Sequence, residues 1–545
     1  MFATKYIFVT GGVISGIGKG IAAASIAYLL KESGYRVTIQ KFDPYINVDP
    51  GTMSPFQHGE VFVTNDGSET DLDLGHYERF LNQDMGKANN ATTGQIYYEV
   101  IKKERRGDYL GATIQVIPHI TDEIISLIKR ETDNSEYDFI ITEVGGTVGD
   151  IESLPYLEAI RQFELLYGRE NCLNIHVTMI PFIKVTGEVK TKPTQHSVQK
   201  LREIGIQPEV LICRSEYPMI DASIQKKIGL FCNISPTHVI EAYDASSIYE
   251  VPLILHKHGI LEILTKKFNL EVPNEFDPTE LKSKVNTILY PSHSVIIAVV
   301  GKYTVLLDAY KSIMESFIHA GIENDVKVNL KFIEAEDLEI SNHERIKANF
   351  DGIDGILIPG GFGERGIEGK LSAIRVAREN NIPFFGICLG LQTAVIEFAR
   401  NVMGLEGANS TEFDKKTPHP VIELLNDQVG VTQKGGTMRL GVYKCELQKN
   451  SKAYDAYDSE AIHERHRHRY EVNNDYRDKL MEAGMLVSGK NSTLDLVEII
   501  ELLDHPWFVA VQFHPEFKSR LSSAHPLFRD FVKASLENKK NLNVL

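Results

Sequence analysis

Short apolar runs that alternate with amphipathic stretches dominate the first half of the chain. Residues 6–10, 37–42 and 139–144 are apolar runs typical of buried strands, and residues 22–33 have helical character. Strands that alternate with helices in this way predict a parallel sheet whose two faces are covered. We therefore expect the first half of the chain to be an α/β domain.

The pattern changes at residues 269–292, which carry prolines and charges and show little periodicity. We expect a linker there. A new buried-type strand begins at residues 295–300, and a second α/β pattern follows, in which residues 383–387 are a central strand. The chain is thus predicted to consist of one domain at residues 1–268, the linker, and a second domain at residues 293–545.

Composition and charge narrow the functional classes. The 545 residues are 43% hydrophobic and 24% charged, which indicates a globular protein of about two to four domains. The net charge of −16 argues against general nucleic-acid binding or attraction to an anionic membrane. No apolar run reaches the ~18 residues of a membrane helix. Five cysteines without a CxxC pair favour reduced thiols in a cytoplasmic enzyme.

The first chemical motif is the glycine-rich stretch GGVISGIGKG at residues 11–20, between a predicted strand and a predicted helix. Backbone N–H groups and the helix dipole favour a phosphate at such a place, and Lys19 can reach nucleotide phosphates. The stretch departs from a strict Walker motif, since Val13 replaces the first glycine and Gly20 replaces the hydroxyl residue that binds magnesium. The alternative is a structural turn with a surface lysine.

Magnesium would therefore need other ligands, and two carboxylate sites are candidates. One is the acidic run of Asp66, Glu69, Asp71 and Asp73, of which the last two share a side if the run is extended. The other is Glu143, at the end of a buried-type strand, where ligands of open α/β sheets bind. A solvated loop and a helix-capping acid are the respective alternatives.

A second candidate phosphate site is the segment GEVKTKPTQ at residues 187–195. Lys190 and Lys192 supply two cations, neighbouring threonines supply hydroxyls, and Gln195 supplies an amide that can read the edge of a base. The set suits a triphosphate. An ordinary basic surface loop is the alternative.

The C-terminal half carries a predicted nucleophile. Cys388 lies in GICLG between a predicted strand and helix, which is the nucleophile-elbow pattern with cysteine in place of serine. The N–H of Leu389 and the PGGFG loop at residues 359–363 can donate to an oxyanion. His514 can activate Cys388, and Glu516 can orient the imidazole. The alternative for an isolated cysteine, a small buried apolar residue, does not explain these neighbours.

Two further residues are candidates for substrate binding near the thiol. The basic cluster HRHR at residues 466–469 is too small for a nucleic-acid site in a chain of this charge. We expect Arg469 to meet a substrate carboxylate and Glu412 to meet its ammonium group.

These motifs resemble two known domains. The motifs PGGFG, GICLGLQ and HPE resemble a class I glutamine amidotransferase domain. FVTGGVISGIGKG, ETDLDLGHYERF, EVGGTVGDIES and GEVKTKPTQHS resemble the synthetase domain of the CTP synthase family, and the resemblance spans essentially the whole chain. It implies an N-terminal P-loop-like parallel sheet, similar to dethiobiotin synthetase, and a C-terminal class I glutamine amidotransferase α/β domain.

The resemblance also implies roles for individual residues. The residues implied to bind ATP are Gly16, Ile17, Gly18, Lys19, Gly20, Ile21, Asp73, Tyr243, Asp244 and Ala245. Those implied to bind UTP or CTP are Ser15, Asp150, Ile151, Glu152, Lys190, Thr191, Lys192, Pro193, Thr194, Gln195 and Lys227. Those implied to bind glutamine are Gly361, Leu389, Gly390, Leu391, Gln392, Glu412 and Arg469. Asp73 and Glu143 would hold magnesium, and Cys388, His514 and Glu516 would form a catalytic triad.

The implied activity is ATP-dependent amination of UTP to CTP in pyrimidine biosynthesis, with glutamine or free ammonia as nitrogen source. Ammonia released at the triad would pass to a UTP that is phosphorylated on its 4-oxygen. The resemblance further implies a homotetramer, activation by GTP and feedback inhibition by CTP. An amidoligase that acts on a carboxylate is one alternative, and a P-loop ATPase that acts as a switch, with a degenerate C-terminal domain, is another.

Overall fold

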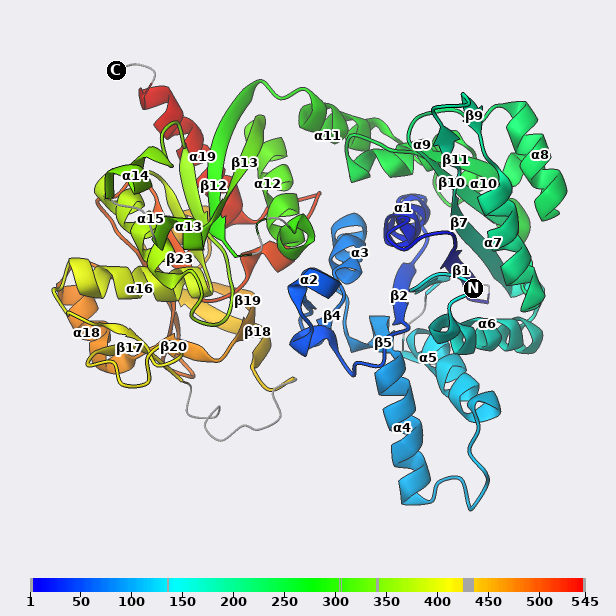
Figure 1. The fold of residues 1–545 in the computed structure, drawn as a ribbon, viewed down its shortest axis with the longest axis horizontal. Helices are drawn as coiled ribbons and strands as arrows, with labels where there is room; N and C mark the ends of the chain where they lie inside the picture. The colour runs from blue at the N-terminus through cyan, green and yellow to red at the C-terminus, as the bar shows by residue number, and fades with distance from the viewer. Residues whose placement is uncertain are drawn as a thin grey trace. The chain divides into compact units, whose positions relative to one another are not determined.

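A computed structural model describes residues 3–134, 137–302, 304, 306–339, 343–424 and 436–542. The chain forms two compact units (Figure 1). The N-terminal unit comprises Met1–Asp49 and Asp73–Leu289, and the C-terminal unit comprises Pro50–Leu72 and Tyr290–Leu545. Pro50–Leu72, which we expected within the first domain, thus packs with the C-terminal half of the chain.

A seven-stranded parallel sheet forms the centre of the N-terminal unit. Its spatial order is β11 (Val239–Tyr243), β10 (Val210–Ser215), β7 (Cys172–Met179), β1 (Lys5–Gly11), β6 (Phe139–Val144), β2 (Val37–Asp43) and β5 (Asn90–Thr92). The short strands β8 (Phe182–Ile183) and β9 (Glu188–Val189) form a separate hairpin. Strands occur where the apolar runs predict them, and the predicted α/β class is confirmed.

Helices cover both faces of this sheet. Successive side chains of β1 point to opposite faces, so both faces carry apolar side chains that must be covered. Tyr6 and Phe8 pack with α5 and α6 in one apolar cluster, whereas α1 contacts β1, β2 and β6. The helices of the unit are α1 (Lys19–Glu32), α3 (Asp73–Leu81), α4 (Thr93–Arg106), α5 (Thr121–Asn134), α6 (Leu154–Tyr167), α7 (Lys192–Glu203), α8 (Ala222–Cys232), α9 (Val251–Lys257), α10 (Ile260–Phe268) and α11 (Thr279–Leu289).

Helix α11 lies within the stretch that we predicted to be a linker. Its Leu281 and Val285 are buried and stand four residues apart, which places them on one face of the helix. An amphipathic pattern of only two buried positions is too short to stand out in the sequence. Residues 269–292 are therefore partly helical, and the N-terminal unit extends through Leu289.

A nine-stranded mixed sheet forms the centre of the C-terminal unit. Its order is β13 (Val326–Glu334), β12 (His293–Gly301), β14 (Gly355–Ile358), β15 (Phe384–Ile387), β23 (Phe508–Val511), β22 (Leu496–Glu501), β21 (Leu486–Asn491), β18 (Arg439–Leu447) and β19 (Ala461–His468). The first five strands are parallel, and the others are antiparallel to their neighbours. This second sheet confirms the predicted two-domain α/β architecture.

Helices and smaller sheets complete the C-terminal unit, with one apolar cluster on each face of the large sheet. The helices are α2 (Pro55–His58), α12 (Lys311–Asn324), α13 (Ala335–Glu339), α14 (His343–Ala348), α15 (Ile367–Glu379), α16 (Leu389–Asn401), α17 (Lys452–Tyr457), α18 (Asn474–Glu482) and α19 (Pro526–Leu542). The small sheets contain β3 (Phe62–Val63), β4 (Glu69–Thr70), β16 (Asn409–Ser410), β17 (Pro420–Leu424) and β20 (Tyr470–Val472). Across the described residues, none of the helices has both the length and the apolar character that a bilayer crossing demands.

Candidate functional site

The sheet of the N-terminal unit brings the glycine loop, the segment after Glu143 and the segment that leads to residues 187–195 to one edge. Strand β1 lies between β6 and β7, and all three are parallel, so the segments that follow them meet at the same edge. Val148 N donates to Gly11 O at 2.8 Å, and Gly12 N donates to Val177 O at 3.0 Å. The glycine loop after β1 is therefore held between the segments that follow its two neighbours.

The glycine loop has left-handed backbone at three positions. Val13, Gly16 and Gly18 have φ values of +82°, +68° and +88°, and helix α1 starts directly after them at Lys19. Lys19 is not a surface lysine, because it is buried and its Nζ donates to Gly146 O at 2.6 Å. Burial lowers the pKa of Lys19, and the nearby Glu143 opposes that effect. A buried ammonium group at a helix N-terminus is suited to receive a phosphate.

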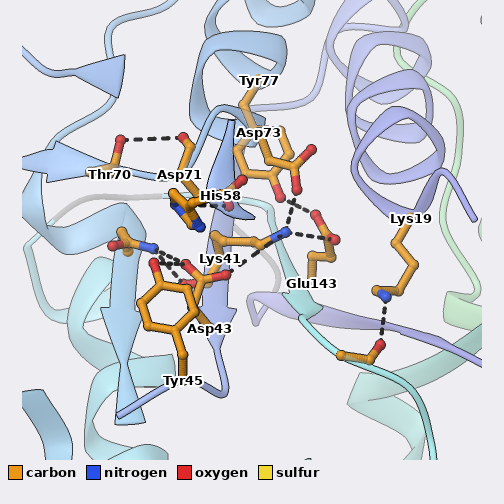
Figure 2. A network of polar contacts seen from close by, with 12 residues as sticks. Lys19, Lys41, Asp43, Tyr45, His58, Thr70, Asp71, Asp73, Tyr77 and Glu143 are labelled. Atoms are coloured by element: carbon orange, nitrogen blue, oxygen red, sulfur yellow. Dashed lines mark hydrogen bonds and ion pairs between the residues drawn. The ribbon is translucent and has the colours of Figure 1, made fainter. Parts of the chain in front are cut away.

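Two of the predicted carboxylates converge on a lysine that the sequence analysis missed (Figure 2). Lys41 Nζ donates to Asp73 and, at 3.0 Å, to Glu143 Oε1. Burial raises the pKa of Glu143 and would also raise that of Asp73, but Lys41 brings the pKa of Asp73 down to about 2. Tyr77 donates its hydroxyl to Glu143. A lysine in the fully buried strand β2 was the available signal, since lysine is rarely buried without a partner.

Asp73 and Glu143 fit a magnesium ion by their chemistry. Both carboxylates contact the same cation, the ammonium group of Lys41. Magnesium prefers hard oxygen ligands such as these. No group of three or more histidine, cysteine or acidic residues that could hold a metal ion occurs in the described parts of the chain. The two carboxylates would thus need phosphate oxygens to complete the coordination of an ion.

The rest of the acidic run has a different environment. Asp66, Glu69 and Asp71 belong to the C-terminal unit, whereas Asp73 belongs to the N-terminal unit. Glu69 forms an ion pair of 2.8 Å with Arg467, and Asp71 lies 3.5 Å from His58 (Figure 2). Glu69 and Asp71 therefore have partners other than Lys41, which contacts Asp73 and Glu143.

Several residues expected to bind ATP line one pocket of the N-terminal unit. Its walls include Gly18, Ile21, Tyr243, Asp244 and Ala245, together with the apolar side chains of Ile212, Ile248, Val251 and Leu255. The pocket also contains Arg214, which forms an ion pair with Asp244 and donates from Nη1 to Ile17 O at 3.2 Å. Apolar walls with a charged pair suit a planar base. The sequence analysis missed Arg214, although it lies near the end of a buried strand.

The segment expected to bind a triphosphate is fixed at the start of helix α7. Lys192 and Pro193 begin the helix, and the buried Thr194 donates its hydroxyl to Met179 O at 3.2 Å. Gln195 Nε2 donates to Thr191 Oγ1 at 3.1 Å. Lys190 pairs with Glu188. Hydrogen bonds of Thr194 and Gln195 thus fix the backbone beside Lys190 and Lys192.

The other residues expected to bind UTP or CTP are exposed. Ser15 lies in the glycine loop, and Asp150, Ile151 and Glu152 follow strand β6. Lys227 is an exposed residue of α8 that lowers the pKa of Glu188, after the larger effect of Lys190. In the described part of the chain, no hydrogen bond or ion pair joins residues 150–152 to residues 190–195.

A buried histidine connects the glycine loop to helix α7. His176 contacts Thr10 Oγ1 through Nδ1 at 2.9 Å and Ser197 Oγ through Nε2 at 2.7 Å. Burial and, to a lesser extent, Lys19 lower the pKa of His176 to about 3, so the ring stays neutral at ordinary pH. A Cβ atom at Gly12 would lie 1.6 Å from Ser197 Oγ, which explains the glycine there.

In the C-terminal unit, adjacent parallel strands collect the predicted glutaminase residues. Strands β14, β15 and β23 are neighbours, and they lead into the loop 359–363, Cys388 and the segment 512–516. A Cβ atom at Gly360 would lie 2.8 Å from His514 Cε1 and 3.6 Å from Cys388 Cβ. The loop, the nucleophile and the histidine therefore meet at one place.

Cys388 has the backbone of a nucleophile elbow. Its φ is +52° and its ψ is −101°, a conformation that a residue with a side chain rarely adopts. Cys388 N donates to Val511 O at 2.7 Å, and helix α16 starts at Leu389. Gln512 Nε2 lies 3.8 Å from the Cys388 sulfur. The strained turn places the thiol at the N-terminus of helix α16.

His514 and Glu516 form the remainder of the predicted triad. His514 Nδ1 lies 2.7 Å from Glu516 Oε1. Burial would lower the pKa of His514, but Glu516 and Cys388 together raise it to about 10. Glu516 thus holds the imidazole at Nδ1, whereas Nε2 has no hydrogen-bond partner among the described residues and remains for the thiol proton.

The residues expected to bind glutamine lie in helix α16, in the loop 359–363 and near Tyr470. Leu389, Gly390, Leu391 and Gln392 form the buried first turn of α16, and Gly361 belongs to the glycine loop. Glu412 accepts a hydrogen bond from Gly363 N at 2.8 Å, and Arg469 donates to Thr437 Oγ1 at 3.1 Å. Burial raises the pKa of Tyr470, Glu412 raises it further and Arg469 lowers it, so both charges lie near that tyrosine.

The basic cluster at residues 466–469 is buried or partly buried and does not form an exposed charged surface. His466 and His468 are buried, and burial lowers the pKa of each well below its ordinary value. Arg467 pairs with Glu69 and donates to Gly51 O at 3.0 Å. Its neighbour Arg465 donates to Asn65 Oδ1 at 2.6 Å. Residues from the segment 50–72 thus neutralise or cover this part of the C-terminal unit.

Comparisons with known proteins cover nearly the whole chain. Residues 5–270 match the family described as CTP synthase N-terminus, and residues 305–534 match class I glutamine amidotransferase. The chain is 58% identical to the CTP synthase of Clostridium acetobutylicum over 98% of this chain and 99% of that protein. It is 59% identical to the CTP synthase of Carboxydothermus hydrogenoformans, with the same coverage of both chains.

Part of the chain is also similar to a solved structure. The glutaminase domain of the Trypanosoma brucei enzyme CTPS with bound acivicin is 40% identical, with a TM-score of 0.42. The match covers 45% of this chain and 94% of that chain.

The pH dependence of stability tests the His514–Glu516 pair. Because the folded-state pKa of His514 is about 10 and its ordinary value is 6.5, the protonated ring stabilises the fold fully below about pH 6.5, and this contribution disappears as the pH rises through 10. Glu516→Gln should therefore lower the thermal midpoint of the C-terminal unit most at pH 6 and least at pH 10. At pH 6 the free energy of unfolding should fall by ~1.5–3 kcal/mol. Differential scanning calorimetry across this range measures the effect.

Glu482→Gln, at an exposed glutamate at the end of α18, is the matched control and should leave the midpoint unchanged at each pH. An equal loss of stability at pH 6 and pH 10 for Glu516→Gln would contradict the assigned pair.

Proposed function

This chain belongs to the CTP synthase family. We propose that its two compact units contain the two active sites of the CTP synthase reaction. The enzyme catalyses glutamine-dependent and ATP-dependent amination of UTP to CTP. The observation that carries the assignment of sites is the meeting of the strained Cys388, the His514–Glu516 pair and the glycine loop in one unit. The buried set of Lys19, Lys41 and two carboxylates supports the second site.

In the proposed glutaminase reaction, the Cys388 thiolate attacks the carboxamide carbon of glutamine. The N–H groups of Gly361 and Leu389 stabilise the oxyanion of the tetrahedral intermediate. His514 then gives its proton to the leaving nitrogen, so ammonia departs and a thioester remains on Cys388. Water, deprotonated by His514, hydrolyses the thioester to glutamate and restores the thiol.

Substrate binding in this unit is proposed to depend on opposite charges. Arg469 binds the α-carboxylate of glutamine, and Glu412 binds its ammonium group. Burial raises the pKa of Glu412, and the hydrogen bond from Gly363 N opposes this effect, with smaller contributions from Lys302 and Lys370. The first turn of α16, from Leu389 to Gln392, completes the pocket.

In the proposed synthetase reaction, ATP phosphorylates the 4-oxygen of UTP, and ammonia then displaces the phosphate. Phosphorylation converts a poor oxygen leaving group into a good one. Lys19 and Lys41 neutralise the charge that develops on the transferred phosphoryl group. Asp73 and Glu143 would hold a magnesium ion, whose chemistry is to neutralise phosphate charge as well.

The nucleotides are assigned to two parts of this unit. The pocket lined by Tyr243, Asp244 and Ala245 suits the adenine of ATP, whose phosphates would extend along the loop Gly16–Ile21 toward Lys19. Ser15, residues 150–152, residues 190–195 and Lys227 are proposed to bind UTP and the product CTP. Two cations in the segment 190–195 favour a triphosphate, whereas nothing favours an amidoligase that acts on a carboxylate.

Family membership supports several further proposals. The synthetase domain comprises residues 1–268 and the amidotransferase domain residues 293–545, with Pro50–Leu72 packed in the C-terminal unit. Ammonia is passed from the glutaminase site to the synthetase site. We also infer activation by GTP, feedback inhibition by CTP, a homotetramer and a cytoplasmic location.

Substitution of Cys388 tests whether the two chemistries are separate. Cys388→Ala should abolish CTP formation from glutamine, because no thioester can form, and should leave CTP formation from ammonium chloride within about twofold of wild type. The absorbance change that accompanies conversion of UTP to CTP measures both. Failure of the variant with ammonia as well would show that the sites are not separate.

Substitution of Lys19 tests the synthetase site. Lys19→Ala should lower CTP formation from glutamine and from ammonia by at least ~100-fold, because the transferred phosphoryl group loses its cationic partner. Basal glutamine hydrolysis should survive, but its stimulation by ATP and UTP should fall. A variant that forms CTP from ammonia at the wild-type rate would move ATP binding away from this loop.

Substitution of Arg214 tests the adenine pocket. Arg214→Ala should raise the KM for ATP about 10-fold or more through loss of its charge-assisted contacts, with a smaller effect on the KM for UTP. Arg105→Ala, at an exposed arginine of α4, is the matched control. Initial rates at varied ATP measure the effect, and an unchanged KM would exclude Arg214 from the nucleotide site.

A further inference from the structure

Lys302 lies directly behind the glycine loop of the glutaminase site. It follows strand β12, which pairs in parallel with β14, with Val299 opposite Leu357. Since the carboxyl ends of these two strands meet at one edge, Lys302 lies beside the loop 359–363 that follows β14. The lysine is 5% exposed, and Tyr310 donates its hydroxyl to Lys302 O.

The Lys302 ammonium group holds two consecutive carbonyls of the loop. Its Nζ donates to Phe362 O and to Gly363 O, each at 2.8 Å. The N–H of the same Phe362–Gly363 peptide points the opposite way, because a trans peptide directs its carbonyl and its N–H to opposite sides. That N–H donates to Glu412 Oε1 at 2.8 Å. One peptide plane is thus held at both ends by two side chains of opposite charge.

These contacts are the main polar constraint on the loop. Within the described chain, residues 360–363 make no backbone–backbone hydrogen bond, so a helix or sheet ladder does not fix their peptide planes. Gly360 and Gly361, which directly precede the held peptide, pack against the reacting groups. Cβ atoms built at these two glycines would lie 2.8 Å from His514 Cε1 and 3.4 Å from a methyl group of Leu389. A rotation of the held peptide would therefore change the direction of the N–H groups beside Cys388.

Electrostatics favour the charged form of this clamp. Burial lowers the pKa of Lys302, and Arg365 lowers it further, but Glu412 raises it. Hydrogen bonds that involve a charged donor are stronger than neutral ones, and two of them converge here on one ammonium group. Burial of Lys302 therefore costs free energy, and in the described residues the only acceptors of its ammonium group are carbonyls of the loop.

We propose that Lys302 is a positioning residue for glutamine hydrolysis, which holds the glycine loop so that its N–H groups point at the oxyanion formed on Cys388. This inference rests on the proposed glutaminase function. Lys302 acts through the loop and does not touch the substrate. Its contribution is consequently expected in the transition state, where the oxyanion exists, and not in the binding of glutamine.

The test compares Lys302→Met with wild type in the full-length enzyme. Glutamine hydrolysis should lose ~10- to 100-fold in kcat, since a misdirected donor approaches the effect of a deleted one, and the glutamine KM should change by less than about threefold. Alkylation of Cys388 by iodoacetamide should stay within about twofold of wild type, because this displacement forms no oxyanion. CTP formation from ammonium chloride should be unchanged.

Two variants make the comparison specific. Lys302→Arg keeps a cationic donor and should restore part of the lost kcat. Lys331→Met is the matched control. Lys331, on the exposed side of β13, also donates to a backbone carbonyl, Asn349 O at 2.8 Å. Its substitution should leave the kcat and KM for glutamine, the alkylation of Cys388 and ammonia-dependent CTP formation unchanged.

Three outcomes would overturn the proposal. They are an unchanged kcat in Lys302→Met, a parallel loss of kcat and of Cys388 alkylation, and a loss of ammonia-dependent CTP formation, since the last two show general damage to the fold. A wild-type enzyme that fails to hydrolyse glutamine would instead contradict the proposed function, so the two failures are distinguishable.

Discussion

Parallel pairing of neighbouring strands is the constraint on which both sites depend. In the N-terminal sheet, β1 lies between β6 and β7, and in the C-terminal sheet β14, β15 and β23 are consecutive neighbours. Segments that are far apart in sequence, such as residues 359–363 and 512–516, meet because the carboxyl ends of parallel strands form one edge. The buried and apolar character of these strands therefore determines where the chemistry occurs, even though the strands supply few of the reacting groups.

Buried charge is the second physical feature that the two sites share. Lys19 and Lys302 are buried ammonium groups with lowered pKa values; Lys19 donates to one backbone carbonyl of a glycine-containing loop, and Lys302 donates to two. Lys41 is also buried, but it is neutralised by Asp73 and Glu143. The difference has a functional meaning. A lysine with carbonyl partners keeps its full charge available to a ligand, or it fixes a peptide plane. A lysine between carboxylates can instead exchange partners when another cation or a phosphate arrives.

The sequence predicted the local motifs well, because each depends on short spacing. The elbow at Cys388, the glycine loop before α1 and the strands that precede them follow from adjacent residues. Lys41, Arg214 and Lys302 were missed because their roles depend on partners distant in the chain, namely residues 73 and 143, residue 244, and residues 362 and 363. A lysine or arginine in or directly after a buried strand was the only available signal. Helix α11 was missed for the opposite reason, since its amphipathic pattern is short.

The packing of Pro50–Leu72 shows that a domain drawn from sequence motifs and a compact unit need not coincide. Phe62 and Phe517 have ring centroids 5.1 Å apart, and Glu60 accepts hydrogen bonds from Ser312. Arg465, which is fully buried, donates to Val63 O and to Asn65. A C-terminal fragment that begins at residue 290 would lose these partners and leave a buried guanidinium group without two of its acceptors, which is costly. The glutaminase unit therefore needs residues from the N-terminal part of the sequence for its own stability, and its properties are best measured in the intact chain.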